Sequence, residues 1–187
     1  MRITGGKYVR RQIACPPGII RPAMDMMRES MFSILGDIEG VSFLDLFSGS
    51  GCVAIEAASR GASPIHLVEM DRGKKETIEK NLAFVEEPHR LFMMDAMRYI
   101  SSTPYKYSIV YADPPFPMEE KPKLAEACSR YGIVKDTGLF IIHLPREERK
   151  AWEPRIGDYR LVDERKYGRS ILLFYRPEKD EENENKQ

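Results

Sequence analysis

Short apolar runs alternate with longer amphipathic segments from residue 41 onward. Apolar runs of five to seven residues between turn signals predict buried strands, and apolar residues at helical spacing predict helices. Before this region, a helical stripe of apolar residues predicts a helix over 22–35, and the preceding residues are irregular. The expected strands are 41–47, 64–70, 90–95, 107–113 and 138–144, and the expected helices between them are 52–61, 72–85, 96–101 and 121–133.

This alternation predicts an α/β fold with a mostly parallel sheet and helices on both faces. Two further extended segments, 159–168 and 170–176, are separated only by a tight turn near Gly168 and Arg169. We therefore expect them to be antiparallel neighbours at the C-terminal end of the sheet. Ligands of such sheets bind beyond the carboxyl ends of the strands, so functional residues should gather there.

Charge is distributed unevenly, although the net charge of the 187 residues is zero. Residues 1–30 carry six basic and two acidic side chains, which indicates either a solvated surface or contact with a phosphate-rich partner. We expect a basic N-terminal extension with helix (1–40), one sheet domain (41–177) and an acidic disordered tail (178–187). The candidate RNA contacts in the extension are Arg2, Lys7, Arg10, Arg11, Arg21 and Arg28.

Several classes of protein are disfavoured by composition. No apolar run reaches the roughly 18 residues of a membrane span, and the first residues lack the apolar stretch of a signal peptide. The three cysteines form no CxxC pair, so we expect reduced thiols and no metal site. His66 and His143 lie in apolar strand patterns and are expected to be satisfied core or rim residues. A cytoplasmic protein is the resulting expectation.

The segment "DLFSGSG" (45–51) follows the first expected strand and opens a helix. Gly49 and Gly51 let the backbone turn sharply and approach a ligand closely. Asp45 would repel a pyrophosphate, whereas it suits S-adenosylmethionine, which carries a sulfonium and an ammonium group. The alternative for Asp45 is a helix or turn cap. Phe47, Ser48 and Ser50 belong to the same predicted cofactor-binding loop.

Two more acids end the next two expected strands. Glu69 follows Gly51 by 18 residues, a spacing that suits hydrogen bonds to two ribose hydroxyls. Asp95 would accept from the adenine amino group, or would instead cap the following helix. With their neighbours Met70 and Ala96, these residues complete the predicted cofactor site.

The segment "DPPF" (113–116) follows the fourth expected strand. Asp113 and the carbonyl of Pro114 can accept the two hydrogens of an exocyclic amine and direct its lone pair towards a methyl donor. Pro114 and Pro115 hold these acceptors in place, and Phe116 can stack on the base. A rigid turn without catalytic function is the alternative for an isolated DPP.

Together, "DLFSGSG", "VEMD", "DA" and "ADPPF" resemble class I S-adenosylmethionine-dependent methyltransferases that modify amino groups. "MRITGGKYVRRQI", "RPAMDMMRESMFSIL" and "KYGRSILLFY" make the chain similar to the bacterial 16S rRNA guanine-N2 methyltransferase family called RsmD, over residues 1–176. Ala23 stands where that family usually has threonine.

The resemblance implies a Rossmann-like class I methyltransferase sheet that binds S-adenosylmethionine and methylates guanine N2 of small-subunit rRNA by direct transfer. It also implies a 16S rRNA substrate within an assembled small ribosomal subunit, and we expect a monomer. Two alternatives stay open: N6-adenine methylation of DNA, and a non-catalytic RNA-binding assembly factor with the same fold.

Overall fold

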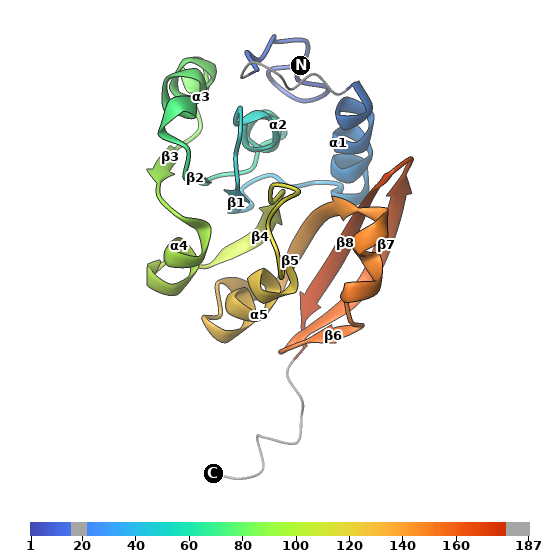
Figure 1. Ribbon diagram of the computed structural model, residues 1–187. Coiled ribbons are helices and arrows are strands. Elements are labelled where there is room, and N and C mark those ends of the chain that lie inside the picture. The colour runs from blue at the N-terminus through green and yellow to red at the C-terminus, as the bar shows by residue number, and fades with distance from the viewer. Residues whose placement is uncertain (16–21, 179–187) are drawn as a thin grey trace.

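The computed structural model describes residues 1–15 and 22–178, without the side chains of residues 22 and 23. Eight strands form one sheet in the order β3-β2-β1-β4-β5-β8-β7-β6 (Figure 1). The strands are β1 (Phe43–Leu46), β2 (Ile65–Glu69), β3 (His89–Met93), β4 (Tyr107–Ala112), β5 (Val134–Pro145), β6 (Arg155–Ile156), β7 (Tyr159–Tyr167) and β8 (Ser170–Pro177). The helices are α1 (Pro22–Leu35), α2 (Cys52–Ser59), α3 (Lys75–Leu82), α4 (Ala96–Ser102) and α5 (Pro122–Arg130), with 3₁₀ turns η1 (Arg72–Lys74) and η2 (Arg146–Ala151).

The first five strands are parallel to one another, and β8 pairs antiparallel with both β5 and β7. This confirms the predicted mostly parallel sheet with an antiparallel C-terminal strand. Gly168, at a φ of 57°, makes the expected tight turn between β7 and β8. The sequence did not predict β6 or η2. It also placed the start of β5 four residues late, because the polar Lys135-Asp136-Thr137 segment hides the strand pattern.

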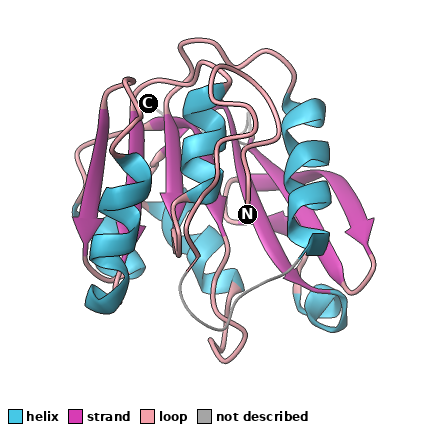
Figure 2. Ribbon diagram, turned by 90° about the horizontal axis from the view of Figure 1, so that it is seen from above, coloured by secondary structure: helices cyan, strands magenta, loops and turns pink. Residues whose placement is uncertain are grey.

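Helices cover both faces of the sheet, as the sequence predicts. Helices α1, α2 and α3 lie on one side, and α4 and α5 on the other (Figure 1). In the view from above, α3, α2 and α1 lie side by side over one face of the sheet (Figure 2). Along β1, Phe43 belongs to the core under α1 and α2, whereas Leu44 and Leu46 belong to the opposite core. Asp45 therefore faces the α2 side by strand alternation. No helix among residues 1–15 and 22–178 is long and apolar enough to cross a bilayer.

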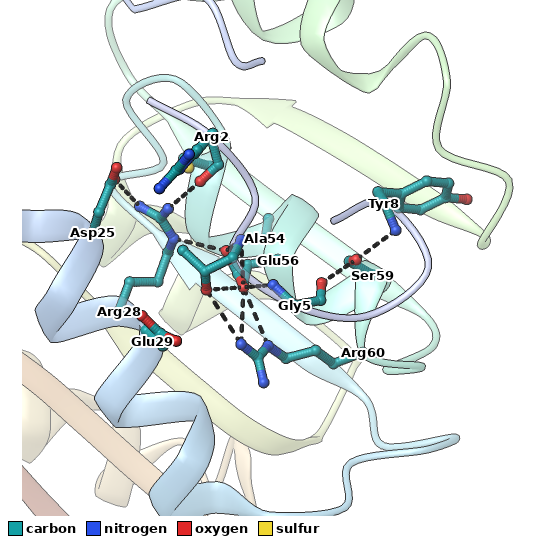
Figure 3. Close-up of polar contacts among 12 residues, drawn as sticks. Arg2, Gly5, Tyr8, Asp25, Arg28, Glu29, Ala54, Glu56, Ser59 and Arg60 are labelled. Atoms are coloured by element: carbon teal, nitrogen blue, oxygen red, sulfur yellow. Dashed lines mark hydrogen bonds and ion pairs between the residues drawn. The ribbon is translucent and has the colours of Figure 1, made fainter. Parts of the chain in front are cut away.

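A buried carboxylate fastens the N-terminal segment to the sheet domain (Figure 3). Glu56 of α2 is fully buried and accepts backbone hydrogen bonds from Thr4 at 3.0 Å and Gly5 at 3.0 Å. Its Oε2 also accepts from Arg28 Nε of α1 at 2.9 Å, and its Oε1 from Arg60 at 3.1 Å. One side chain thus joins the N-terminal segment, α1 and α2.

The environment of Glu56 favours its ionised form. Burial alone would raise the pKa of this carboxyl, but the hydrogen bonds from Thr4 and Arg28 outweigh it and leave the pKa below its usual value of 4.5. Arg28 is itself buried and also lies 3.1 Å from Asp25. Buried charges of this kind are stable only while every partner is present.

Glu56→Gln should lower the free energy of unfolding by about 3 kcal/mol at pH 7, because it removes the buried anion that Arg28 and Arg60 share and leaves Arg28 paired with Asp25 alone. The folded-state pKa of Glu56 is lowered, so its contribution is complete above pH 4.5 and is lost as the pH falls through the folded-state value. Urea unfolding at several pH values should therefore show the two proteins converging in acid. Glu79→Gln, which removes an exposed pair with Lys75, is the control and should change stability by less than about 0.5 kcal/mol. Equal effects of the two substitutions on stability would contradict the conclusion that Glu56 joins the N-terminal segment to α1 and α2.

Candidate functional site

Three acidic side chains meet at one edge of the sheet. Asp45 lies in β1, Glu69 ends β2 and Asp113 follows β4, and these three strands are neighbours in the order β2-β1-β4. Two cavities of about 130 and 420 Å³ open at this edge. Met24, Phe47, Gly49 and Asp113 line both, so the two cavities are parts of one cleft.

The glycine-rich loop between β1 and α2 forms the centre of the cleft. Phe47, Gly49 and Gly51 have φ angles of 64°, 61° and 80°, a left-handed conformation that favours glycine. A Cβ on Gly51 would also lie 3.3 Å from Leu67, whereas one on Gly49 would meet open space. Ser48 Oγ donates to the Asp45 carbonyl at 2.9 Å, and Ser50 Oγ accepts from Cys52 N at 3.3 Å. The two serines therefore hold the loop closed at both ends.

Asp45 lies below this loop and is almost fully buried, with 1% of its surface exposed. Its Oδ2 accepts from the backbone of Ala54 in the first turn of α2, at 3.3 Å. This is the cap-like contact that the sequence left as an alternative. Burial raises the pKa of Asp45 well above its usual range, and the nearby Asp113 and Glu69 carboxylates raise it further. The site thus disfavours a negative charge at Asp45 unless a cation lies beside it.

Glu69 joins the glycine loop to the loop after β2. Its Oε2 accepts from Gly49 N and its Oε1 from Asp71 N, both at 2.9 Å. Lys74 approaches the same carboxylate at 3.7 Å. Each oxygen keeps a further lone pair for a ligand hydroxyl, and Glu69 lines the larger cavity beside the exposed Met70.

Asp95 has the structural role that the sequence held open. It is the N-cap of α4, and its Oδ1 accepts from Arg98 N at 2.9 Å. Asp95 and the buried Ala96 also line the larger cavity. Capping uses one carboxylate oxygen, so the second is available to a ligand in the cavity.

The DPPF segment forms the rim of the larger cavity. All four of its residues line that cavity; Pro114 is buried, and Phe116 is 49% exposed. Asp113 N donates to Leu46 O at 3.4 Å, and Asp113 Oδ1 accepts from His143 Nδ1 at 2.8 Å. The fixed Asp113 carboxylate and the exposed Phe116 ring thus lie three residues apart in the sequence, and both line the larger cavity.

Two side chains that sequence reasoning missed hold this segment. Lys121 is buried; its Nζ donates to Phe116 O at 3.2 Å and to both oxygens of Glu148 in η2 at 2.7 Å. His143 was expected to be a satisfied core or rim residue; its Nδ1 bonds Asp113, whereas its Nε2 has no partner among the described residues. No local signal marks either residue, because their side-chain partners, Glu148 and Asp113, are 27 and 30 residues away in the sequence. His66 does have a partner as predicted, bonding Tyr107 Oη at 2.6 Å.

The basic residues of the N-terminal segment have different environments. Arg2, Arg10 and Arg11 are exposed, and Lys7 is exposed but paired with Glu86 and Glu87. Arg28 is only 4% exposed, which contradicts the surface role expected from the sequence. Its position on α1 directs the guanidinium to Glu56 rather than to solvent. Arg21 lies outside the described residues.

The family model described as "Conserved hypothetical protein 95" matches residues 1–176. The chain belongs to this family. The resemblance to RsmD is confirmed by relatives as well: "Ribosomal RNA small subunit methyltransferase D" of Escherichia coli K12 is 38% identical over 120 residues, or 62% of this chain. That alignment spans 60% of the E. coli protein, less than two thirds of its length. "Putative rRNA methyltransferase YlbH" of Bacillus subtilis is 26% identical over 94% of this chain and 98% of its own.

A solved structure supports the same family. "Putative methyltransferase yhhF from Escherichia coli" superposes with a TM-score of 0.83 at 27% identity, over 96% of this chain and 99% of that one. The Rossmann-like class I methyltransferase fold predicted from the motifs is therefore confirmed.

Asp45→Asn should stabilise the protein at pH 8 by about 1 kcal/mol, because it removes a charge that the folded state disfavours. The folded-state pKa of Asp45 is raised, so the penalty is absent at low pH and grows as the pH rises through that value. Thermal unfolding should show a melting temperature about 2–4 °C higher at pH 8, and no difference near pH 3. Asp95→Asn, which preserves the cap acceptor of an exposed residue, should melt like the wild type. An Asp45→Asn variant that is less stable than the wild type at pH 8 would refute the raised pKa of Asp45.

Proposed function

We propose that the protein transfers a methyl group from S-adenosylmethionine to the exocyclic N2 of a guanine in small-subunit rRNA, the guanine at position 966 of 16S rRNA. The observation that carries this proposal is the Asp113 carboxylate, fixed where the cofactor cleft meets the exposed Phe116. Membership of a family with rRNA methyltransferase relatives supports the substrate class.

The cleft suits a cationic cofactor. Asp45, Glu69 and Asp113 bring three carboxylates together, and among the described Lys and Arg side chains only Lys74, at 3.7 Å from Glu69, forms an ion pair with any of them. Glu69 would bind the ribose hydroxyls, Asp95 and Ala96 the adenine, and the loop around Gly49 the methionine portion. A sulfonium beside Asp45 would offset the penalty of ionising that buried acid. The bound cofactor supplies an activated methyl group on sulfur.

The chain's own residues prepare the amine. The free oxygen of Asp113 and the carbonyl of Pro114 accept its two hydrogens, so the nitrogen lone pair is directed into the cleft. Phe116 stacks on the face of the extruded base. As the new N–C bond forms, the C–S bond would break, and the electron pair of the C–S bond would stay on sulfur. Asp113 accepts the proton that the nitrogen loses and passes it to water.

The RNA is expected to reach the cleft past the N-terminal segment. Met1 and Cys15 line the smaller cavity, so the segment that carries Arg2, Arg10 and Arg11 borders the site. These exposed arginines can bind phosphates without reading sequence. Because these arginines are few, we propose that the substrate is the assembled small subunit, where other contacts add affinity. We also propose that the protein acts as a monomer in the cytoplasm.

The deciding experiment uses tritiated methyl donor and small ribosomal subunits from a strain that lacks the modification, followed by nucleoside analysis. Label in N2-methylguanosine is expected. Label in N6-methyladenosine would retain the mechanism and overturn the base. No transfer, with S-adenosylhomocysteine still bound in calorimetry, would mean that the chemistry has been assigned to the wrong substrate and would overturn the proposed rRNA target.

Asp113→Ala should reduce kcat by about 10²–10³-fold, the loss typical when one fixed polar group is removed from a reacting centre. The cofactor affinity should stay within a few-fold, because Glu69 and the glycine loop are unchanged. Glu119→Ala, an exposed carboxylate in the same loop, is the control and should keep full activity. An active Asp113→Ala enzyme would rule out the proposed amine contact.

A further inference from the structure

His143 lies level with Asp113 in the sheet. Strands β4 and β5 pair in parallel with Ala112 opposite Ile142, so Asp113, directly after β4, and His143, within β5, occupy the same level. Side chains at the same level of neighbouring strands project to the same face. The result is the 2.8 Å contact between His143 Nδ1 and Asp113 Oδ1.

The chemistry of this contact fixes the tautomer of the ring. An ionised carboxylate only accepts hydrogen bonds, so Nδ1 must carry the proton and donate it. Oδ1 of Asp113 is thereby occupied, and the carboxylate is held against rotation. Its second oxygen is the one left for a substrate amine.

The other ring nitrogen argues against a purely structural role. His143 is 3% exposed and lines the larger cavity, while its Nε2 has no hydrogen-bond partner among the described residues. A buried acceptor without a protein partner carries a desolvation cost, so a nitrogen of this kind that lines the cavity needs an explanation. A leucine would fill similar space without that cost but would lose the bond to Asp113, so the histidine is accounted for by what its Nδ1 does for that carboxylate.

We propose that His143 is a positioning residue for methyl transfer: its Nδ1–H holds the Asp113 carboxylate so that the second oxygen meets the amine. This inference rests on the proposed function. It assigns to β5 a part in catalysis that the DPPF motif does not contain. His143 itself does not touch the reacting nitrogen.

The two ring nitrogens can be separated by substitution. Asparagine places an amide donor near the position of Nδ1, glutamine places one near Nε2, and leucine removes both while keeping bulk. We expect His143→Leu and His143→Gln to lose about 10- to 100-fold in kcat, the effect of a misplaced acceptor, with the KM for methyl donor within two-fold. His143→Asn should keep kcat within about five-fold of the wild type. Thermal unfolding is the folding control: each of the three variants should melt at or above the melting temperature of Asp113→Ala.

Several results would overturn the inference. Wild-type kcat in His143→Leu would show that Asp113 needs no support, and His143→Asn as slow as His143→Leu would show that Nδ1 is not the important atom. Nitrogen-15 NMR of labelled histidine provides a test independent of turnover. We expect the Nδ1–H tautomer for His143 in the wild type and its loss in Asp113→Ala. An Nε2–H tautomer in the wild type would refute the proposal even if the RNA substrate had been misassigned, whereas failure of wild-type methylation would affect only the proposed function.

Discussion

Crowding of acids at the carboxyl edge of the sheet is the constraint on which the rest of the site depends. Asp45, Glu69 and Asp113 converge because β1, β2 and β4 are adjacent and parallel. The protein stabilises them chiefly with N–H donors rather than with cationic side chains: Ala54 for Asp45, Gly49 for Glu69 and His143 for Asp113. Dipolar donors leave the edge negative, and a negative cleft is ready for a cationic ligand. The glycine loop is thus both a turn and a source of donors.

Two buried acids on the same side of the sheet show the opposite arrangement of charge. Glu56 is surrounded by arginines and backbone donors, and its pKa is lowered. Asp45 lacks such cations, and its pKa is raised. A carboxylate satisfied by the protein contributes to stability, whereas one left to be satisfied by a ligand reduces stability and supports binding. Arg28 is one of the cations that satisfy Glu56, which accounts for the burial of its guanidinium.

Much of the fold and of the site is encoded locally. Runs of apolar residues predicted the five parallel strands and the β7–β8 hairpin, because burial on both faces of a strand leaves an uninterrupted apolar pattern. The positions of the loop over 45–51 and of the DPPF segment at strand ends followed from the same pattern. Local pattern also allowed two roles for Asp95, and the structure shows that one oxygen caps α4 while the residue still faces the cavity.

The sequence by itself determined the order of the elements apart from β6 and η2, and the acids that gather at the carboxyl edge of the sheet. Only the tertiary structure decided the partners: His143 with Asp113, Lys121 with Glu148, and Arg28 with Glu56. The physical reason is distance along the chain. Periodicity and turn chemistry act within a few residues, whereas these contacts join residues from separate elements and depend on strand register and helix packing.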